Sequence, residues 1–348
     1  MFICIKAQRL SRGADRDQLS ALRRSSSTQL QRVAHAALVG CAVLASSTAV
    51  KAQTFTFASA ATGNDANNCT RAAPCLTLQR AVDVVAAGGH VQVLTSGAYG
   101  DTPLQINKSV TISADGVSAN VRGISILSPM GKVALRGLHL GGRAAALGTP
   151  GIEILDAASV HIERCTVERF PRDGVAVSAL DVAVFILDSN VSHNGRHGLI
   201  FVGDGANPTL TVDNSHFDDN KNSGMFLRDL SASLTRTAAS ANGDYGVILS
   251  GANTNASWIT VSNNLQGGII VNSRSELTLE SSVVHGSGFG IGVLTHARSS
   301  TRLSNSLVTG NEYGVFVGTA VVLTRGNNTI IGNTNNVFGG SLTPLGGI

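Results

Sequence analysis

A short segment that begins with glycine and continues with large apolar residues recurs through most of the chain. The segments begin at Gly151, Gly174, Gly198, Gly224, Gly246, Gly268, Gly290 and Gly314. Their spacing of 22 to 26 residues is too short for helical repeats of about 33 to 47 residues. The Leu-x-x-Leu-x-Leu frame of leucine-rich repeats is absent. Three short strands and three bends fit this length, since a strand residue advances the chain by about 3.3 Å.

Asparagine or serine occupies the bend before each glycine segment from Gly198 onwards, and one more asparagine follows the last segment at the same spacing. These residues are Asn194, Asn220, Asn242, Asn264, Ser287, Asn311 and Asn333. We expect left-handed backbone at the bends, which glycine and asparagine tolerate better than other residues. One coil cannot bury its apolar face alone, so neighbouring coils must stack about 4.8 Å apart. The repeat therefore predicts an all-β fold, a single-stranded parallel β-helix with 22 to 26 residues per coil.

The region before the regular repeats is interpreted as a cap followed by less regular coils. Leu76–Ala87 has apolar residues at helical spacing and is followed by Gly88–Gly89, which predicts a short helix covering the open edge of the first coil. We divide the chain into a signal peptide (1–52), an N-terminal cap and first coil (53–100), the β-helix (101–338) and a Gly-rich tail (339–348).

Residues 1–52 have the pattern of an export signal. An arginine-rich lead precedes the small apolar residues of Val33–Ala49, and Val50–Ala52 suits signal peptidase. The apolar run is shorter than the about 20 residues that a membrane span needs. We therefore expect a periplasmic or secreted protein with no membrane span after cleavage. The alternative is a lipoprotein modified at Cys41, which ends a Leu-Val-Gly-Cys sequence.

The charge distribution argues against nucleic-acid binding. Residues 1–52 carry eight Lys and Arg against two Asp and Glu, whereas residues 53–348 carry 18 against 20. The formal net charge of +4 thus arises entirely from the predicted signal, and the remainder lacks the basic surface that nucleic acids require.

The cysteines suggest one covalent crosslink. Cys69 and Cys75 lie six residues apart and are expected to form a disulfide in an oxidising compartment; the alternative is two reduced thiols. Cys165 lies in an alternating apolar segment and is interpreted as a buried structural thiol.

The repeat resembles that of the right-handed parallel β-helix proteins in the pectate-lyase-like superfamily. The opening Thr62–Cys75, followed by the expected helix and Ala87–Gly89, is similar to an exported bacterial subgroup. The resemblance covers most of residues 55–338 and implies a right-handed coil that binds or acts on polysaccharide. It does not select an activity, because this fold hosts lyases, hydrolases, epimerases, esterases and adhesins. The motifs of its polygalacturonase-like and pectate-lyase enzymes are absent here.

Charged residues gather in the bends near the glycine segments. We call the following seven the rim: Asp173, Arg196, His197, Asp218, Asp219, Lys221 and Asp244. Two carboxylates beside an arginine have the chemistry to hold Ca²⁺ and a uronate, with a Lys, Arg or His as base for β-elimination. Two carboxyls about 6.5–9.5 Å apart would suit inverting hydrolysis. The alternative is a ladder of charges on a solvated edge.

Strand alternation predicts an inner and an outer row along the glycine segments. The inner row is Val175, Leu199, Met225, Val247, Ile269, Ile291 and Val315. The outer row includes what we call the apolar stripe, Ile200, Phe226, Ile248 and Ile270. An exposed stripe would mark a binding or oligomer contact; the alternative is coverage by loops such as Gly203–Pro208 or Gly251–Ala256. Candidate sugar-contacting residues are Phe226, Arg228, Tyr245 and Tyr313.

Three functions remain open from the sequence. The absent enzyme motifs favour an exported β-helix that binds polysaccharide or a cell-envelope partner without catalysis. The second is a polysaccharide lyase, hydrolase or epimerase with a non-standard site at the rim, for which Ca²⁺ is the cofactor that the chemistry suggests. The third is a structural or adhesive surface protein that uses the apolar stripe.

Overall fold

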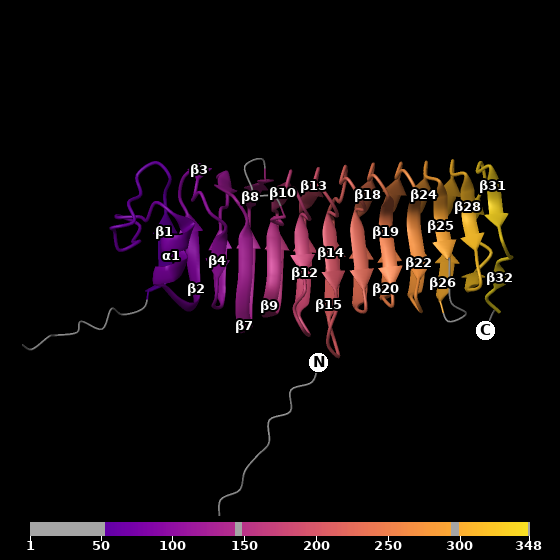
Figure 1. The fold of residues 1–348 in the computed structure, drawn as a ribbon, viewed down its shortest axis with the longest axis horizontal. Coiled ribbons are helices and arrows are strands. Elements are labelled where there is room, and N and C mark those ends of the chain that lie inside the picture. The colour runs from indigo at the N-terminus through magenta and orange to yellow at the C-terminus, as the bar shows by residue number, and fades with distance from the viewer. Residues whose placement is uncertain (1–52, 143–147, 294–298, 347–348) are drawn as a thin grey trace, which may run out of the picture. The chain divides into compact units, whose positions relative to one another are not determined.

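The computed structural model describes residues 53–142, 148–293 and 299–346. The predicted signal peptide and Cys41 lie outside this part of the chain. The described residues lie in one compact unit, in which the chain passes repeatedly through three columns of parallel strands (Figure 1). The predicted parallel β-helix is confirmed.

The first column contains the glycine segments and their upstream equivalents. Its strands are β4 (Leu104–Ile106), β11 (Val175–Val177), β14 (Leu199–Val202), β16 (Met225–Arg228), β19 (Tyr245–Ser250), β22 (Gly267–Asn272), β25 (Phe289–Val293), β28 (Tyr313–Val317) and β31 (Asn335–Phe338). Two long strands, β7 (Ile124–Arg136) and β9 (Ile152–Glu163), pass through both this column and the second.

The second column begins at the N-terminal edge of the described residues. Its strands are β1 (Gln53–Ala58), β2 (Val85–Val93), β5 (Val110–Ser113), β12 (Ala183–Leu187), β15 (Thr209–Asp213), β17 (Ser231–Thr235), β20 (Asn253–Ser257), β23 (Glu276–Glu280), β26 (Ser300–Ser304), β29 (Val321–Thr324) and β32 (Thr343–Pro344). Because β32 pairs with β29, part of the Gly-rich tail extends the stack by one strand.

The third column consists of short strands. They are β3 (Gly97–Ala98), β6 (Ala119–Val121), β8 (Leu138–Gly141), β10 (Thr166–Glu168), β13 (Asn190–Ser192), β18 (Ala238–Ser240), β21 (Thr260–Ser262), β24 (Val283–His285), β27 (Leu307–Thr309) and β30 (Thr329–Ile330). His216 bridges Asn190 and Ala238, so the column is continuous between β13 and β18.

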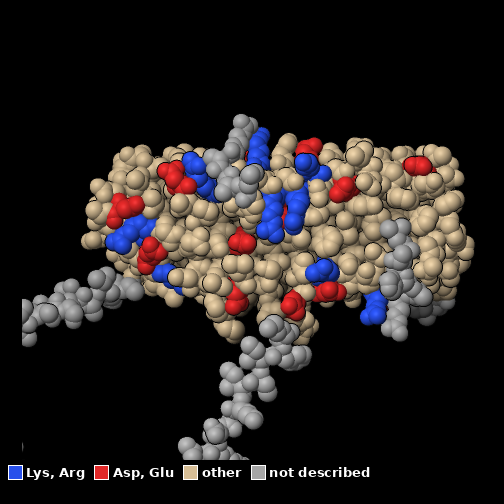
Figure 2. Space-filling model, in the orientation of Figure 1, with Lys and Arg blue, Asp and Glu red and all other residues tan. Residues whose placement is uncertain are grey.

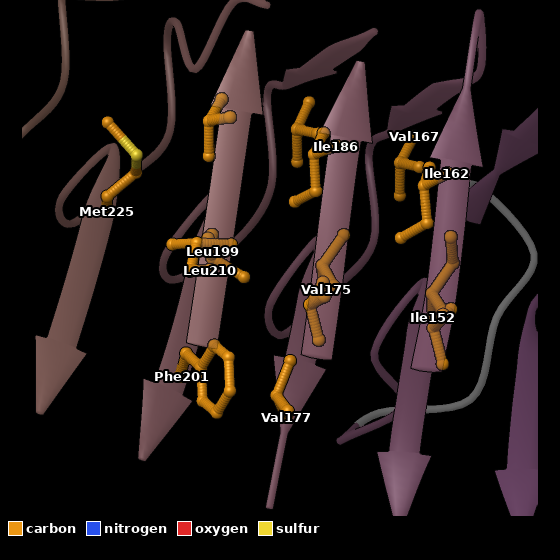
Figure 3. Close-up of a cluster of buried hydrophobic side chains, with 14 of the residues drawn as sticks. Ile152, Ile162, Val167, Val175, Val177, Ile186, Leu199, Phe201, Leu210 and Met225 are labelled. Atoms are coloured by element: carbon orange, nitrogen blue, oxygen red, sulfur yellow. The ribbon is translucent and has the colours of Figure 1, made fainter. Parts of the chain in front are cut away.

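The core is a set of aligned aliphatic rows inside the coils. The predicted inner row is confirmed, since each of its seven members is at most 1% exposed. Ile152, Val175, Leu199 and Met225 come from successive coils of the first column (Figure 3). Each fully buried side chain of this size stabilises the fold by about 1.5–3 kcal/mol.

The asparagine column does not adopt the left-handed backbone that we expected. The left-handed residue is the one before it, such as His193 or Asp219, with φ of 57° and 56°. The asparagine side chains instead form a buried ladder: Asn194 Nδ2 donates to Asn220 Oδ1 at 3.0 Å, and Asn220 Nδ2 donates to Asn242 Oδ1 at 3.1 Å. Each amide thereby satisfies polar groups of the bend that water cannot reach.

The ladder has one interruption in the described coils. It continues from Asn242 to Asn264 and resumes between Asn311 and Asn333, with Ser287 in between. The Ser287 hydroxyl accepts from the Asn264 backbone N–H at 3.2 Å, and the Ser287 N–H donates to Asn311 Oδ1 at 3.0 Å. The backbone contacts are therefore kept, but the side-chain amide chain is broken.

The repeated glycines are also explained by space and not by a left-handed backbone. A Cβ on Gly224 would lie 2.8 Å from the carbonyl oxygen of Gly246 and 3.0 Å from Asn242 Nδ2. A Cβ on Gly198 would lie 2.7 Å from the carbonyl oxygen of Gly224. Only glycine permits this close approach of adjacent coils beside the asparagine ladder.

The predicted capping helix is present but shorter than expected. Helix α1 spans Leu78–Val84, begins at the N-cap Thr77, and packs on β1, β2 and β4. The prediction of Leu76–Ala87 was too long because Val85 already starts β2, which also contains Gly88–Gly89. Among the described residues, no helix has the length and apolarity to cross a membrane.

The expected disulfide between Cys69 and Cys75 is formed, and Cys165 is buried as predicted. Burial raises the pKa of the Cys165 thiol to about 11, so this thiol is protonated at neutral pH. Cys165 begins a second row of stacked residues. Its backbone N–H donates to Ser189 Oγ at 3.1 Å, and the Ser189 backbone N–H donates to Ser215 Oγ at 3.1 Å.

Replacing both Cys69 and Cys75 by serine is expected to lower the free energy of unfolding by about 2 kcal/mol, because the unfolded chain loses a loop closure. Urea denaturation of the full chain would measure the change. A reductant should have the same effect on the unaltered protein and none on the double variant. Equal stability of both proteins without reductant would contradict the prediction.

Candidate functional site

The bend before β11 holds a buried carboxylate between two arginines of adjacent coils. The Asp173 side chain is 0% exposed; its Oδ1 accepts from Arg196 Nε at 3.0 Å and from the His197 backbone N–H at 3.2 Å. Its Oδ2 lies 3.0 Å from Arg196 Nη2 and 3.2 Å from Arg172 Nε. The angles at Oδ2 do not meet hydrogen-bond geometry, so these contacts are ion pairs. We call Arg172, Asp173 and Arg196 the arginine clamp.

The clamp presents positive charge to solvent. The side chains of Arg172 and Arg196 are 41% and 38% exposed, whereas Asp173 is fully covered. Their backbones are adjacent, because the Arg196 N–H donates to the Arg172 carbonyl at 2.9 Å. Asp173 uses only part of the five N–H donors of each guanidinium. Figure 2 shows two basic side chains side by side near the middle of one face.

His197 lies beside the clamp as a half-buried, neutral ring. Burial lowers the pKa of His197; Arg196 lowers it further, while Asp173 and Asp244 oppose the shift. Nδ1 accepts from the Ser223 backbone N–H at 3.3 Å, which places the proton of the neutral ring on Nε2. The ring centroid lies 5.7 Å from that of Phe226. His197 therefore offers a hydrogen-bond donor and an aromatic edge, not a free base.

The rest of the predicted rim is divided between two places. Asp244 belongs to the backbone column of the clamp, since its N–H donates to the Asn222 carbonyl and the Asn222 N–H donates to the Arg196 carbonyl. Asp218 lies at the end of the third column, where its Oδ1 accepts from the Ser240 N–H at 2.8 Å, and burial raises its pKa.

The neighbours of Asp218 are turned further outward. Asp219 is the left-handed residue of the bend and lies 3.8 Å from His193. Lys221 is exposed and makes no side-chain ion pair in the described structure. Within residues 53–142, 148–293 and 299–346, no group of three or more His, Cys, Asp or Glu side chains is arranged to hold a metal.

The predicted sugar-contacting residues are likewise dispersed. Phe226 reaches the clamp through His197, and Arg228 is an exposed residue 3.8 Å from Asp229. Tyr245 is half-buried in β19. Tyr313 belongs to an aromatic cluster that the sequence analysis did not predict. Its ring centroid lies 5.3 Å from that of Phe289 and 5.0 Å from that of Phe338. Phe289 and Tyr313 occupy the same position in successive strands, and this shared position could have predicted their contact.

The apolar stripe forms a continuous outer row. Ile200, Phe226, Ile248 and Ile270 pair in register on successive strands. The first three are half-buried and Ile270 is 4% exposed, because each member covers its neighbour. The proposed coverage by a Gly251–Ala256 loop is wrong, since strand β20 begins at Asn253. An oligomer contact through the stripe stays a prediction.

Comparison with known proteins agrees with this architecture. A family model described as a right-handed beta helix region matches residues 107–258. The A-modules of the mannuronan C-5 epimerases AlgE4 and AlgE6 from Azotobacter vinelandii superpose with TM-scores of 0.53 and 0.54 at 17% identity, covering 77% of this chain and 95% and 93% of the modules. The chain folds as a right-handed parallel β-helix.

A rhamnogalacturonan lyase shares this right-handed β-helix with a TM-score of 0.54 and 13% identity, over 73% of this chain and 82% of the lyase. At these identities the likeness establishes the fold alone. No curated protein matches the sequence of the β-helix.

Proposed function

We propose that this protein is an exported β-helix that binds an acidic polysaccharide at the arginine clamp. The observation that carries the proposal is the fully buried carboxylate of Asp173, which fixes two half-exposed guanidiniums on adjacent coils. A guanidinium fork matches a carboxylate in a bidentate geometry. Because both arginines are already ordered, a ligand carboxylate would order few side chains on binding.

The surroundings of the clamp suit a sugar chain. His197 supplies a neutral N–H donor, and Phe226 supplies an apolar ring face beside it. Both are compatible with a pyranose whose carboxylate is held by the arginines. The structural relatives named above as mannuronan epimerases and a rhamnogalacturonan lyase act, by their names, on polymers of this chemical class.

Two groups at the clamp, His197 and Asp173, are poorly placed to act as a base. A β-elimination or epimerisation requires a base with a free lone pair near the sugar. The Nδ1 lone pair of His197 is occupied by the Ser223 N–H, and the Asp173 carboxylate has no exposed surface. Export is supported by the Cys69–Cys75 disulfide, which is typical of oxidising compartments.

The sharpest test removes the clamp without leaving an unpaired charge. In the triple variant R172Q/D173N/R196Q, both cations and the buried anion become neutral together. We expect the affinity for mannuronan to fall at least about tenfold, since hydrogen bonds to charged groups contribute about 1.5–3 kcal/mol each. Isothermal titration calorimetry of the mature chain would measure this, and affinity of the unaltered protein should decrease with rising salt.

Two controls make the result specific. Arg302→Gln removes an arginine that pairs with Glu276 on β23 and should leave affinity unchanged. R172K/R196K keeps the charge but loses the planar fork, so intermediate binding is expected. Unchanged affinity in the triple variant would place the polymer elsewhere. Shortening of the polymer during the titration would show that the protein is an enzyme.

A further inference from the structure

A groove lies over the third column and ends at Glu168, just before the bend that carries the arginine clamp. Its volume is about 350 Å³, and its walls are formed by β3, β6, β8 and β10. Small or apolar residues line most of it, with a few polar side chains converging from neighbouring coils: Ala98, Gly100, Val121 and Gly141, together with Asn120, Arg122, His139 and Glu168. A concave, mostly apolar surface with a few fixed polar groups is the usual form of a small-molecule site.

The polar groups of the groove come from three successive coils. Asn120 pairs in register with His139, and His139 with Thr166, two residues before Glu168. His139 Nδ1 lies 2.8 Å from Asn120 Oδ1, and His139 Nε2 lies 3.4 Å from Glu168 Oε1. The imidazole thus joins an amide and a carboxylate into one fixed row.

Two further contacts hold the ends of this row. Glu168 also pairs with Arg169, and its side chain is 18% exposed. Arg122 pairs with Asp101 at 3.2 Å and is 42% exposed, so the groove has a guanidinium donor at its edge. The groove therefore offers a largely covered acceptor at Glu168, an exposed acceptor at Asn120 and a donor at Arg122.

We propose that this groove binds a neutral pyranose unit of a glycan. The Glu168 carboxylate and the Asn120 amide oxygen accept from vicinal hydroxyls, Arg122 donates to a ring or hydroxyl oxygen, and the C–H face of the sugar packs on the exposed Ala98. A neutral sugar fits best, because the lining carries one carboxylate, Glu168, and one guanidinium, Arg122, and so has no net charge.

The groove opens onto a surface that suits a longer chain. Beyond His139, the same outward row continues through Thr166 and Asn190. These polar side chains repeat at the coil spacing of about 4.8 Å. The ligand class is therefore a neutral oligosaccharide rather than a free monosaccharide. None of these side chains belongs to the arginine clamp, so the two proposed sites use different residues.

The test uses the full mature chain with histidine side chains labelled for NMR. Cellotetraose, mannotetraose and maltotetraose are added separately, and the His139 signals are assigned with a His139→Gln variant. We expect at least one tetrasaccharide to shift the His139 ring signals while leaving those of His197 in place. Because this readout uses the unaltered protein, it does not depend on the folding of a variant.

Glu168→Gln keeps the shape of the side chain and removes its charge. It should weaken the binding of that tetrasaccharide about tenfold. Glu280→Gln, on the exposed side of β23, should leave binding unchanged. The proposal is overturned if none of the three sugars shifts His139, if only His197 responds, or if Glu168→Gln binds as the unaltered protein does. Failure of mannuronan binding at the clamp would leave all of these readouts intact.

Discussion

Replacing Asn220 by alanine is expected to lower the free energy of unfolding by about 4 kcal/mol, because several buried polar groups lose partners worth about 1–3 kcal/mol each. The Asn220 amide accepts from the Asn194 backbone N–H and from Asn194 Nδ2, and it donates to the Val191 carbonyl and to Asn242 Oδ1. All four contacts lie inside the stack, where water cannot replace them. Urea denaturation followed by circular dichroism would measure the loss.

Asn222→Ala is the matched control for this substitution. Asn222 lies two residues further in the same bend, is half-buried, and its side chain makes no hydrogen bond in the described structure. Its replacement should change stability by less than about 0.5 kcal/mol. If Asn220→Ala and Asn222→Ala had the same small effect, the ladder would contribute nothing to stability.

The second large effect is expected from Gly224→Ala, which should lower the free energy of unfolding by about 3 kcal/mol through overpacking. The new Cβ would lie 2.8 Å from the Gly246 carbonyl oxygen and 3.0 Å from that of Phe217. Both neighbours are backbone atoms, so relief requires adjacent coils to move apart. Thermal and urea unfolding would report the loss.

Gly141→Ala provides the comparison in a strand with more room. There the new Cβ would meet only the His139 ring, at 3.6 Å, an ordinary contact. Its stability should equal or slightly exceed that of the unaltered protein, since alanine restricts the unfolded chain. Equal stability of Gly224→Ala and Gly141→Ala would show that the glycine column is not required by close approach.

The sequence predicted the strand columns and the inner row because both follow from periodicity. A spacing of 22 to 26 residues and alternating apolar side chains leave few alternatives to a parallel β-helix. The role of the asparagines was wrong because residue identity does not reveal whether a bend uses an amide for its backbone angles or for its side chain. Asn194 and Asn220 would recur at the same spacing whether the bend needed their backbone angles or their side-chain amides.

The candidate site was only partly predictable for a related reason. Asp173, Arg196 and His197 were expected near one another and are in contact. Asp218 and Asp219 were grouped with them because they lie in the equivalent bend of the next coil, where stacking was expected to bring the side chains together. However, the left-handed residue at Asp219 turns the chain, so side chains on its two sides serve different columns. The burial of Asp173 could not be read from the sequence, since carboxylates are usually exposed.

At Ser287 two neighbouring coils lack the side-chain amide hydrogen bond that links the others. On its N-terminal side the amides from Asn194 to Asn264 link four coils, and on its other side Asn311 and Asn333 link two more. In a repeat protein each coil is stabilised mainly by its immediate neighbours, so a weaker interface allows the parts on either side to open separately. We therefore expect the coils after Ser287 to unfold locally more readily than the coils that carry the arginine clamp.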